Sequence, residues 1–212
     1  LTSDTRPATA TMWGVRIASN ELLEIDPLSG AAKLAATMNS PDDIVSISFD
    51  VVTGKLFGNT SVGFGAPFEA LYEIDPATGN TTFVGRILFD NVYALAFDQA
   101  GKLFGVSDAT NQLMQINTAN VNRSLVAGLA VGRAFDIASR PEDDVMFLAD
   151  TDTTSLYTLN TGNGNLTLLG AYGANDPNLV GLAFSPVPEP STIVLALVGL
   201  AGVAVLGRRR AR

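Results

Sequence analysis

The side chains that could do chemistry in this chain are carboxylates. The sequence has no histidine and no cysteine, so it lacks an imidazole base, a thiol nucleophile and a thiolate metal ligand. Its 21 Asp and Glu side chains carry hard oxygens that suit Ca²⁺. Asp150-Thr-Asp152 presents carboxylates at alternating positions and is the candidate Ca²⁺ site, although it lacks the longer loop and terminal Glu of an EF-hand. The alternative is an ordinary solvated turn.

Asp150 and Asp152 belong to a larger set of acidic residues in loops that we expect to share one face of the molecule. They are Asp42, Asp43, Asp90, Asp108, Asp150, Asp152 and Asp176, with Arg86 and Arg133 as the obvious cations. A carboxylate with a raised pKa beside a metal ion would support a Ca²⁺-assisted hydrolase or lyase. The sequence shows no recognisable catalytic set, and most of these acids recur at turn positions. We therefore expect a protein without catalysis, and no required cofactor.

The segment 59–69 is the longest of these loops, and it carries two aromatic residues. Phe64 and Phe68 lie among glycine, alanine and proline. Long loops often carry function, so these two rings are candidates for stacking on a sugar or on a partner protein. The alternative is that both rings plug the end of the barrel.

A repeat of about 40 to 50 residues positions these loops. The copies cover roughly 45–85, 92–128 and 134–170, and each holds four short apolar or alternating runs bounded by Gly, Asp, Asn or Pro. Such runs predict β-strands joined by tight turns. In 26–30 and 75–79 the turn pairs a proline with a glycine, and we expect its Asp to bond local backbone amides. Trp13 aligns with Phe57 and Phe104, which indicates core packing.

Four-stranded units in tandem predict the blades of a β-propeller, so the expected fold class is all-β. The phrase Leu-Ala-Phe-Asp-x-x-Gly-Lys-Leu-Phe-Gly-Val-Ser-Asp, followed by Leu-Tyr-x-Ile-Asp-Pro-x-Thr-Gly, is similar to NHL-type and related extracytoplasmic propeller repeats. The resemblance spans about 12–186 and implies four-stranded blades around a central channel.

The two ends of the repeat region predict how the ring closes. Strands are expected at 11–18, 21–26 and 32–37, and a lone first strand at 179–185 would complete their blade and protect its edge. This makes about four blades, or an arc of a larger ring if blades precede Leu1. We expect three parts: a disordered or truncated segment at 1–10, which shows no signal peptide, a propeller at 11–186, and a C-terminal signal at 187–212.

The C-terminus combines an apolar run with a cluster of arginines. The run 192–206 has no charge and precedes Arg208, Arg209, Arg210 and Arg212. A helix over 192–207 spans about 22 to 24 Å, and snorkelling arginines make up much of the difference from a bilayer core of about 30 Å. The positive-inside rule places the arginines in the cytoplasm and the rest of the chain across the membrane.

Immediately before this run stands Pro188-Glu189-Pro190. The order of this motif, apolar helix and arginine cluster resembles the PEP-CTERM sorting signal of Gram-negative bacteria. The resemblance implies export, recognition of the motif by an exosortase-type membrane protease, and removal of the tail. It also implies a setting of exopolysaccharide and biofilm matrix. An ordinary membrane anchor with a stiff linker is the alternative.

Charge narrows the range of partners. Four of the 13 basic residues lie in the final cluster, which leaves 9 against 21 acidic residues and a net charge of −12 before it. Binding to nucleic acid is excluded, because phosphate neutralisation needs a basic surface. The sequence therefore predicts an exported, surface-sorted propeller that binds or scaffolds exopolysaccharide or matrix proteins. Its membrane contact is the C-terminal helix before processing.

Overall fold

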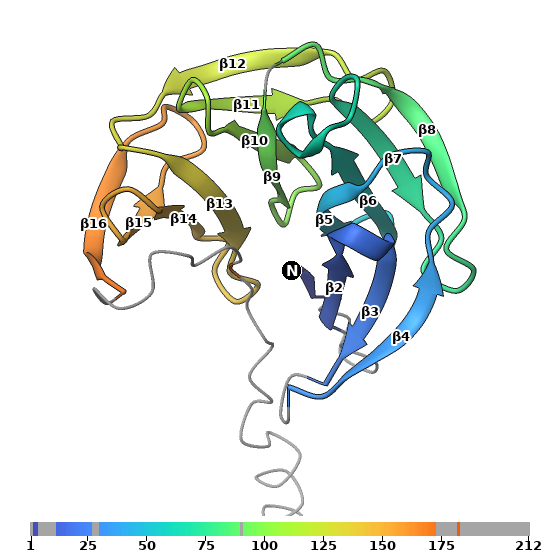
Figure 1. The fold of residues 1–212 in the computed structure, drawn as a ribbon. Coiled ribbons are helices and arrows are strands. Elements are labelled where there is room, and N and C mark those ends of the chain that lie inside the picture. Colours follow the sequence, from blue (N-terminus) through green and yellow to red (C-terminus); the bar gives the residue numbers. More distant parts are fainter. Residues whose placement is uncertain (1, 4–11, 27–29, 90, 173–181, 183–212) are drawn as a thin grey trace, which may run out of the picture.

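The described strands form four antiparallel sheets of four strands each. The computed structural model describes residues 2–3, 12–26, 30–89, 91–172 and 182. The sheets follow one another around a common centre, with β5, β9 and β13 innermost and β4, β8, β12 and β16 outermost (Figure 1). This arrangement confirms the predicted all-β propeller with four blades.

The first two sheets cover the N-terminal half of the chain. The strands of the first sheet are β1 (Thr2–Ser3), β2 (Met12–Arg16), β3 (Glu21–Ile25) and β4 (Ala32–Thr37). Those of the second are β5 (Ile44–Asp50), β6 (Lys55–Thr60), β7 (Ala70–Ile74) and β8 (Thr81–Arg86). Two short 3-10 helices, η1 (Ile17–Ser19) and η2 (Val62–Phe64), lie between the second and third strands of these sheets.

The other two sheets repeat the same order. The strands of the third sheet are β9 (Val92–Phe97), β10 (Leu103–Ser107), β11 (Gln112–Ile116) and β12 (Arg123–Gly128). Those of the fourth are β13 (Ala134–Ser139), β14 (Met146–Asp150), β15 (Ser155–Leu159) and β16 (Leu166–Ala171). In all four sheets the register shifts by one residue where the third strand meets the fourth, which adds local twist at the outer edge.

The repeated Phe-Gly pair in the second strands follows from packing between sheets. Phe57 and Phe104 face the next sheet and are buried in core clusters. A Cβ on Gly58 would lie 2.7 Å from Ile44 Cγ2, so glycine lets the innermost strand pack closely against the second. The repeated phrase therefore encodes contact between sheets on one face and room for the side chains of the adjacent strands on the other.

Three apolar clusters join consecutive sheets. Leu22 and Ile44 belong to the cluster between the first and second sheets, Leu71 and Val92 to the next, and the third joins the last two sheets. Trp13 packs partly buried against the first cluster, as predicted. Within the described ranges no such cluster joins the first sheet to the fourth, and Figure 1 shows these two sheets apart.

The predicted closure by residues 179–185 is wrong where the structure can test it. The innermost position of the first sheet is taken by β1, with Thr2 opposite Trp13 and Ser3 opposite Met12. A strand close in sequence to β2 reaches this position with a shorter loop and a smaller entropy cost than one from the far end of the chain. Of 179–185, only Leu182 is described, and its N–H donates to Asp136 on β13.

Candidate functional site

Loops from neighbouring sheets meet at the end of the propeller where each second strand finishes. We call this end the loop face; its described residues are 17–20, 38–43, 59–69, 87–89, 91, 108–111, 129–133 and 151–154. Hydrogen bonds cross the sheet boundaries there: Arg133 Nη2 donates to Asp108 Oδ2 at 2.6 Å, and Asn20 Nδ2 donates to Ser40 Oγ at 2.7 Å. The prediction that these loops share one face is therefore confirmed.

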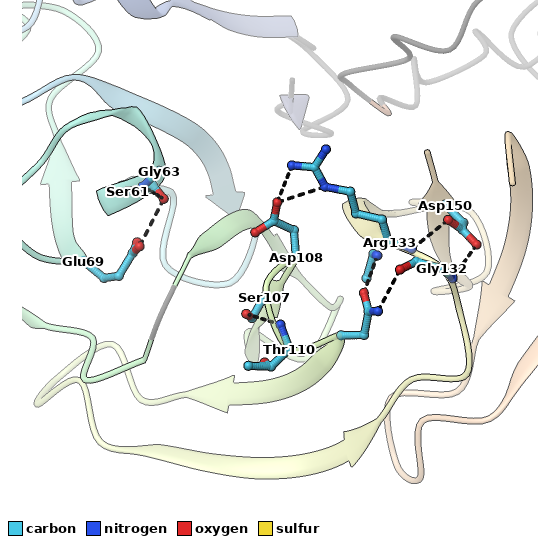
Figure 2. Close-up of polar contacts among 11 residues, drawn as sticks. Ser61, Gly63, Glu69, Ser107, Asp108, Thr110, Gly132, Arg133 and Asp150 are labelled. Atoms are coloured by element: carbon cyan, nitrogen blue, oxygen red, sulfur yellow. Dashed lines mark hydrogen bonds and ion pairs between the residues drawn. The ribbon is translucent and has the colours of Figure 1, made fainter. Parts of the chain in front are cut away.

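Asp150 lies buried at the end of β14 and holds two loops together. Its carboxylate accepts hydrogen bonds from the N–H groups of Gly132 and Arg133 at 2.9 Å each (Figure 2), and from the Asp152 N–H and Thr153 hydroxyl at 3.0 and 2.8 Å. Burial alone would raise the pKa of Asp150, but these hydrogen bonds outweigh it and hold the pKa below its ordinary value. Asp150 therefore joins 129–133 to the turn after β14.

This geometry bears on the predicted Ca²⁺ site. Both oxygens of Asp150 already accept from several donors, and Asp152 packs its Cβ against Gly132. Within the part of the chain that the structure describes, no three His, Cys, Asp or Glu side chains gather in a group that could hold a metal ion. Asp90 and Asp176 lie outside the described residues. Calcium binding at Asp150 and Asp152 stays a prediction.

The aspartates of the tight turns bond their own backbone. Asp50, Asp75 and Asp98 each accept from the N–H two residues further on, at 2.9, 2.9 and 3.0 Å. In the first two turns a threonine hydroxyl three residues on donates as well. Gly79 closes the second turn with a φ of 75°, which favours glycine. The predicted structural role of these carboxylates is confirmed.

The two phenylalanines of the long loop have different surroundings. Phe68 packs partly buried against the cluster between the first two sheets, and the Arg86 guanidinium lies 3.8 Å from its ring centroid. Phe64, on η2, is 45% exposed and its ring lies 5.3 Å from that of Tyr93. Of the two candidates, Phe64 is the one that a ligand can reach, while Phe68 supports the loop.

Phe64 begins a row of rings that crosses the centre of the loop face. Tyr93 on β9 and Phe135 on β13 both occupy the second position of an innermost strand, and their ring centroids are 5.0 Å apart. We call Phe64, Tyr93 and Phe135 the aromatic row. It joins the second, third and fourth sheets at the mouth of the central channel.

An ion pair lies beside the aromatic row. Arg133 donates through Nε and Nη2 to one oxygen, Oδ2, of Asp108, at 3.1 and 2.6 Å (Figure 2). The other oxygen, Oδ1, is buried and has no hydrogen-bond partner among the described residues. The guanidinium carbon lies 5.1 Å from the Phe135 centroid and 5.8 Å from that of Tyr93, so the charge sits over the rings as a cation–π contact.

A repeated clamp fastens the first sheet to the second, and the third sheet to the fourth, on the same face. Asn20 accepts from the Ile44 N–H at 3.1 Å and donates to loop carbonyls. Asn111 accepts from the Ala134 N–H at 2.8 Å and donates to Gly132 O at 2.9 Å. In both cases the amide bonds the first residue of the next innermost strand and the loop before it.

Glu69 occupies the same position in the second sheet. The residue before each third strand accepts a backbone bond from just after the fourth strand: Met38 N–H bonds Asn20 O, Ile87 N–H bonds Glu69 O, Leu129 N–H bonds Asn111 O and Tyr172 N–H bonds Thr154 O. Glu69 is 3% exposed. Its Oε1 accepts from the Ser61 hydroxyl and the Val62 N–H at 3.0 Å each, whereas its buried Oε2 has no partner among the described residues (Figure 2).

Burial controls the protonation of Glu69. It raises the pKa of Glu69 to about 7, although the Val62 N–H and the Ser61 hydroxyl, which donate to the carboxyl group, and the nearby backbone of Asn91 and Val92 lower it. A protonated carboxyl carries an acceptor and a donor, as the amides of Asn20 and Asn111 do. Glu69 therefore matches its repeat equivalents most closely in its neutral form.

Sequence reasoning missed Tyr93, Phe135 and Glu69 as members of the site. The first two were assigned to strands without a role, although their shared position in the repeat was a usable signal. Glu69 was missed because the loop before it is longer than the corresponding loops of the other sheets. Alignment of the repeats by spacing therefore does not match Glu69 to Asn20 or Asn111.

The predicted sorting residues Pro188, Glu189 and Pro190 and the arginines after them lie outside the described residues. So does the predicted helix over 192–207. Among the helices that the structure does describe, none is both long and apolar enough to cross a bilayer.

Comparison with known proteins supports the predicted sorting signal and the predicted propeller fold. A family model described as PEP-CTERM protein-sorting motif matches residues 186–211, and no curated protein matches the chain. The chain therefore carries this sorting motif, as predicted. The motif implies export, recognition by an exosortase-type enzyme, and anchoring by a C-terminal membrane helix before processing.

Two solved structures share the fold at low sequence identity. The crystal structure of a nidogen/laminin complex is 12% identical with a TM-score of 0.60, covering 81% of this chain and 64% of that one. A structural genomics protein of unknown function from Bacteroides thetaiotaomicron is 13% identical with a TM-score of 0.57, covering 74% of this chain and 40% of that one. This chain thus aligns with less than two thirds of either structure, and the likeness concerns the fold alone.

Proposed function

Because the chain carries a PEP-CTERM sorting motif behind a β-propeller, we propose that it is an exported, surface-sorted protein that binds or scaffolds matrix components without catalysis. The sorting motif at 186–211 is the observation that carries this proposal. It directs the body to the compartment where matrix polymers are assembled, and a propeller offers a rigid face on which loops can bind them.

The non-catalytic part of the proposal is supported by how the carboxylates are used. Asp150 is saturated by backbone and hydroxyl donors, and the turn aspartates bond their own backbone. A general acid or base needs a carboxyl group that can reach the reacting atom. These side chains instead fix the loops, which suits a binding surface more than a reaction centre.

Replacing the sorting motif tests the proposal. With Pro188, Glu189 and Pro190 all changed to alanine, the sorting enzyme loses its recognition sequence. We expect the variant to stay in the membrane at full length, while the wild-type body appears at the surface without its tail. Mass spectrometry of both fractions measures this difference.

The matched control is Pro177→Ala, which changes a proline ahead of the matched motif at 186–211. It should be sorted and processed as the wild type is. Equal processing of the triple variant and the wild type would refute the sorting half of the proposal.

A further inference from the structure

The aromatic row and the Arg133–Asp108 ion pair form one continuous surface at the mouth of the channel. Phe64, Tyr93 and Phe135 supply adjacent rings 5.3 and 5.0 Å apart. Arg133 lies within 5.8 Å of two of these rings and is held by Asp108. Apolar faces, a donor and an acceptor thus come from three consecutive sheets, which position them rigidly.

The polar side of this surface has unused hydrogen-bonding capacity. Arg133 donates through both Nε and Nη2 to a single oxygen of Asp108, and 42% of its side chain is exposed. Asp108 has only 5% of its side chain exposed, and its buried Oδ1 has no partner among the described residues. Because Asp108 is buried, the group on the polar side that a ligand can reach is the exposed guanidinium of Arg133, which Asp108 holds in place.

The geometry points to a carbohydrate site: the apolar face of a neutral sugar ring packs on Phe64 and Tyr93, and its hydroxyls bond the exposed guanidinium of Arg133, which Asp108 positions. A pyranose has an apolar C–H face and a rim of hydroxyls that both donate and accept, which matches rings beside a guanidinium–carboxylate pair. This inference rests on the proposed binding role and names its ligand class.

The charge of the chain and the apolar area of the loop face favour a neutral sugar over an anionic polysaccharide and over a partner protein. The net charge of −12 ahead of the final arginine cluster disfavours an anionic polysaccharide. Among the described large apolar side chains that are exposed, those on the loop face are Val62, Phe64 and Leu88. These three side chains form a small apolar centre for a protein interface, whose buried core is about 65% apolar, and a sugar ring needs only one or two of them.

Titration calorimetry on the full chain tests the site. The chain is held in a detergent without a sugar headgroup, and the probes are neutral hexasaccharides of glucose, mannose and galactose, with hexagalacturonate as the anionic probe. We expect at least one neutral probe to bind and hexagalacturonate not to bind. Phe64→Ala should weaken binding by about five- to tenfold, the loss of one stacked ring.

Phe83→Ala is the matched control, since Phe83 is an aromatic residue 52% exposed on the outer strand β8 and should leave the affinity unchanged. Asp108→Asn, checked for an intact melting transition, should also weaken binding. Failure of every neutral probe to bind, or equal affinities of Phe64→Ala and wild type, would overturn the site. Because Phe64→Ala leaves the sorting motif intact, surface delivery is measured separately and distinguishes failure of this site from failure of the proposed function.

Discussion

Asp150→Ala should lower the free energy of unfolding by about 3 kcal/mol or more. The carboxylate is buried and is the acceptor for the N–H groups of Gly132 and Arg133, which belong to the loop that leads into the fourth sheet. Alanine leaves these donors without their partner, and each unsatisfied donor costs about 1 to 3 kcal/mol. Urea unfolding followed by circular dichroism measures the change.

Asp75→Ala is the matched control for this prediction. Asp75 makes the same local turn bonds as Asp150, to the N–H two residues on and a threonine hydroxyl three residues on. It is exposed, and among the described residues its carboxylate has no bond to another loop. Its replacement should cost much less. Equal losses for the two variants would show that the bonds between loops contribute nothing.

The stability of the wild-type protein should fall as the pH rises from about 4.5 to 7, and Glu69→Gln should remove this part of the dependence. Burial raises the pKa of Glu69 from 4.5 to about 7, so in this window the folded state keeps a proton that the unfolded state has lost. The stability is complete below pH 4.5 and is reduced by about 2 to 3 kcal/mol above pH 7. Glutamine keeps an acceptor and a donor at every pH, so the variant should exceed the wild type in stability above pH 7.

Other groups near Glu69 do not confuse the comparison. Tyr93, from β9, has its pKa raised by burial and by the charges of Asp108 and Glu69, so it stays neutral in this range. Burial also raises the pKa of Asp136 to about 6, but that slope is common to both proteins. The chain has no histidine.

The measurement is a series of unfolding curves from pH 5 to 8 for wild type, Glu69→Gln and Glu73→Gln. Glu73 lies on β7, four residues after Glu69, with 37% of its side chain exposed and paired with Lys55, so its variant should keep the wild-type slope. Parallel curves for Glu69→Gln and wild type would contradict the assigned role of Glu69.

Local sequence signals were enough to predict the β-propeller fold. They were not enough where the position of a strand depends on contacts between residues far apart in the sequence. The turns at 75–79 and the Phe-Gly pairs at 57–58 and 104–105 leave a mark in the sequence, because each needs a proline or a glycine at a fixed place, so the repeat could be identified. The closing strand could not be predicted, because loop entropy and contacts between residues far apart in the chain decide which strand takes the innermost position of the first sheet, and β1 takes it in the structure.

The site was predictable in the same partial way. Phe64 was recognised because a long loop with exposed aromatics is visible in a sequence. Tyr93 and Phe135 look like ordinary strand residues. They form a row with Phe64 only because three sheets bring the ring centroids of neighbouring residues to 5.3 and 5.0 Å. The aspartates looked like metal ligands, and only the hydrogen bonds of Asp150 reveal that backbone amides already engage it.

The accessibility of the two ends of the chain on intact cells tests the central claim most directly. Antibodies against the propeller body, and against a tag placed after Arg212, are applied to unbroken and to lysed cells. Export through the sorting motif predicts that the body is labelled on unbroken cells and that the tag is not, because the arginines are retained in the cytoplasm or removed with the tail. A full-length chain that is labelled by both antibodies only after lysis, and that fractionates with soluble cytoplasmic proteins, would contradict the account.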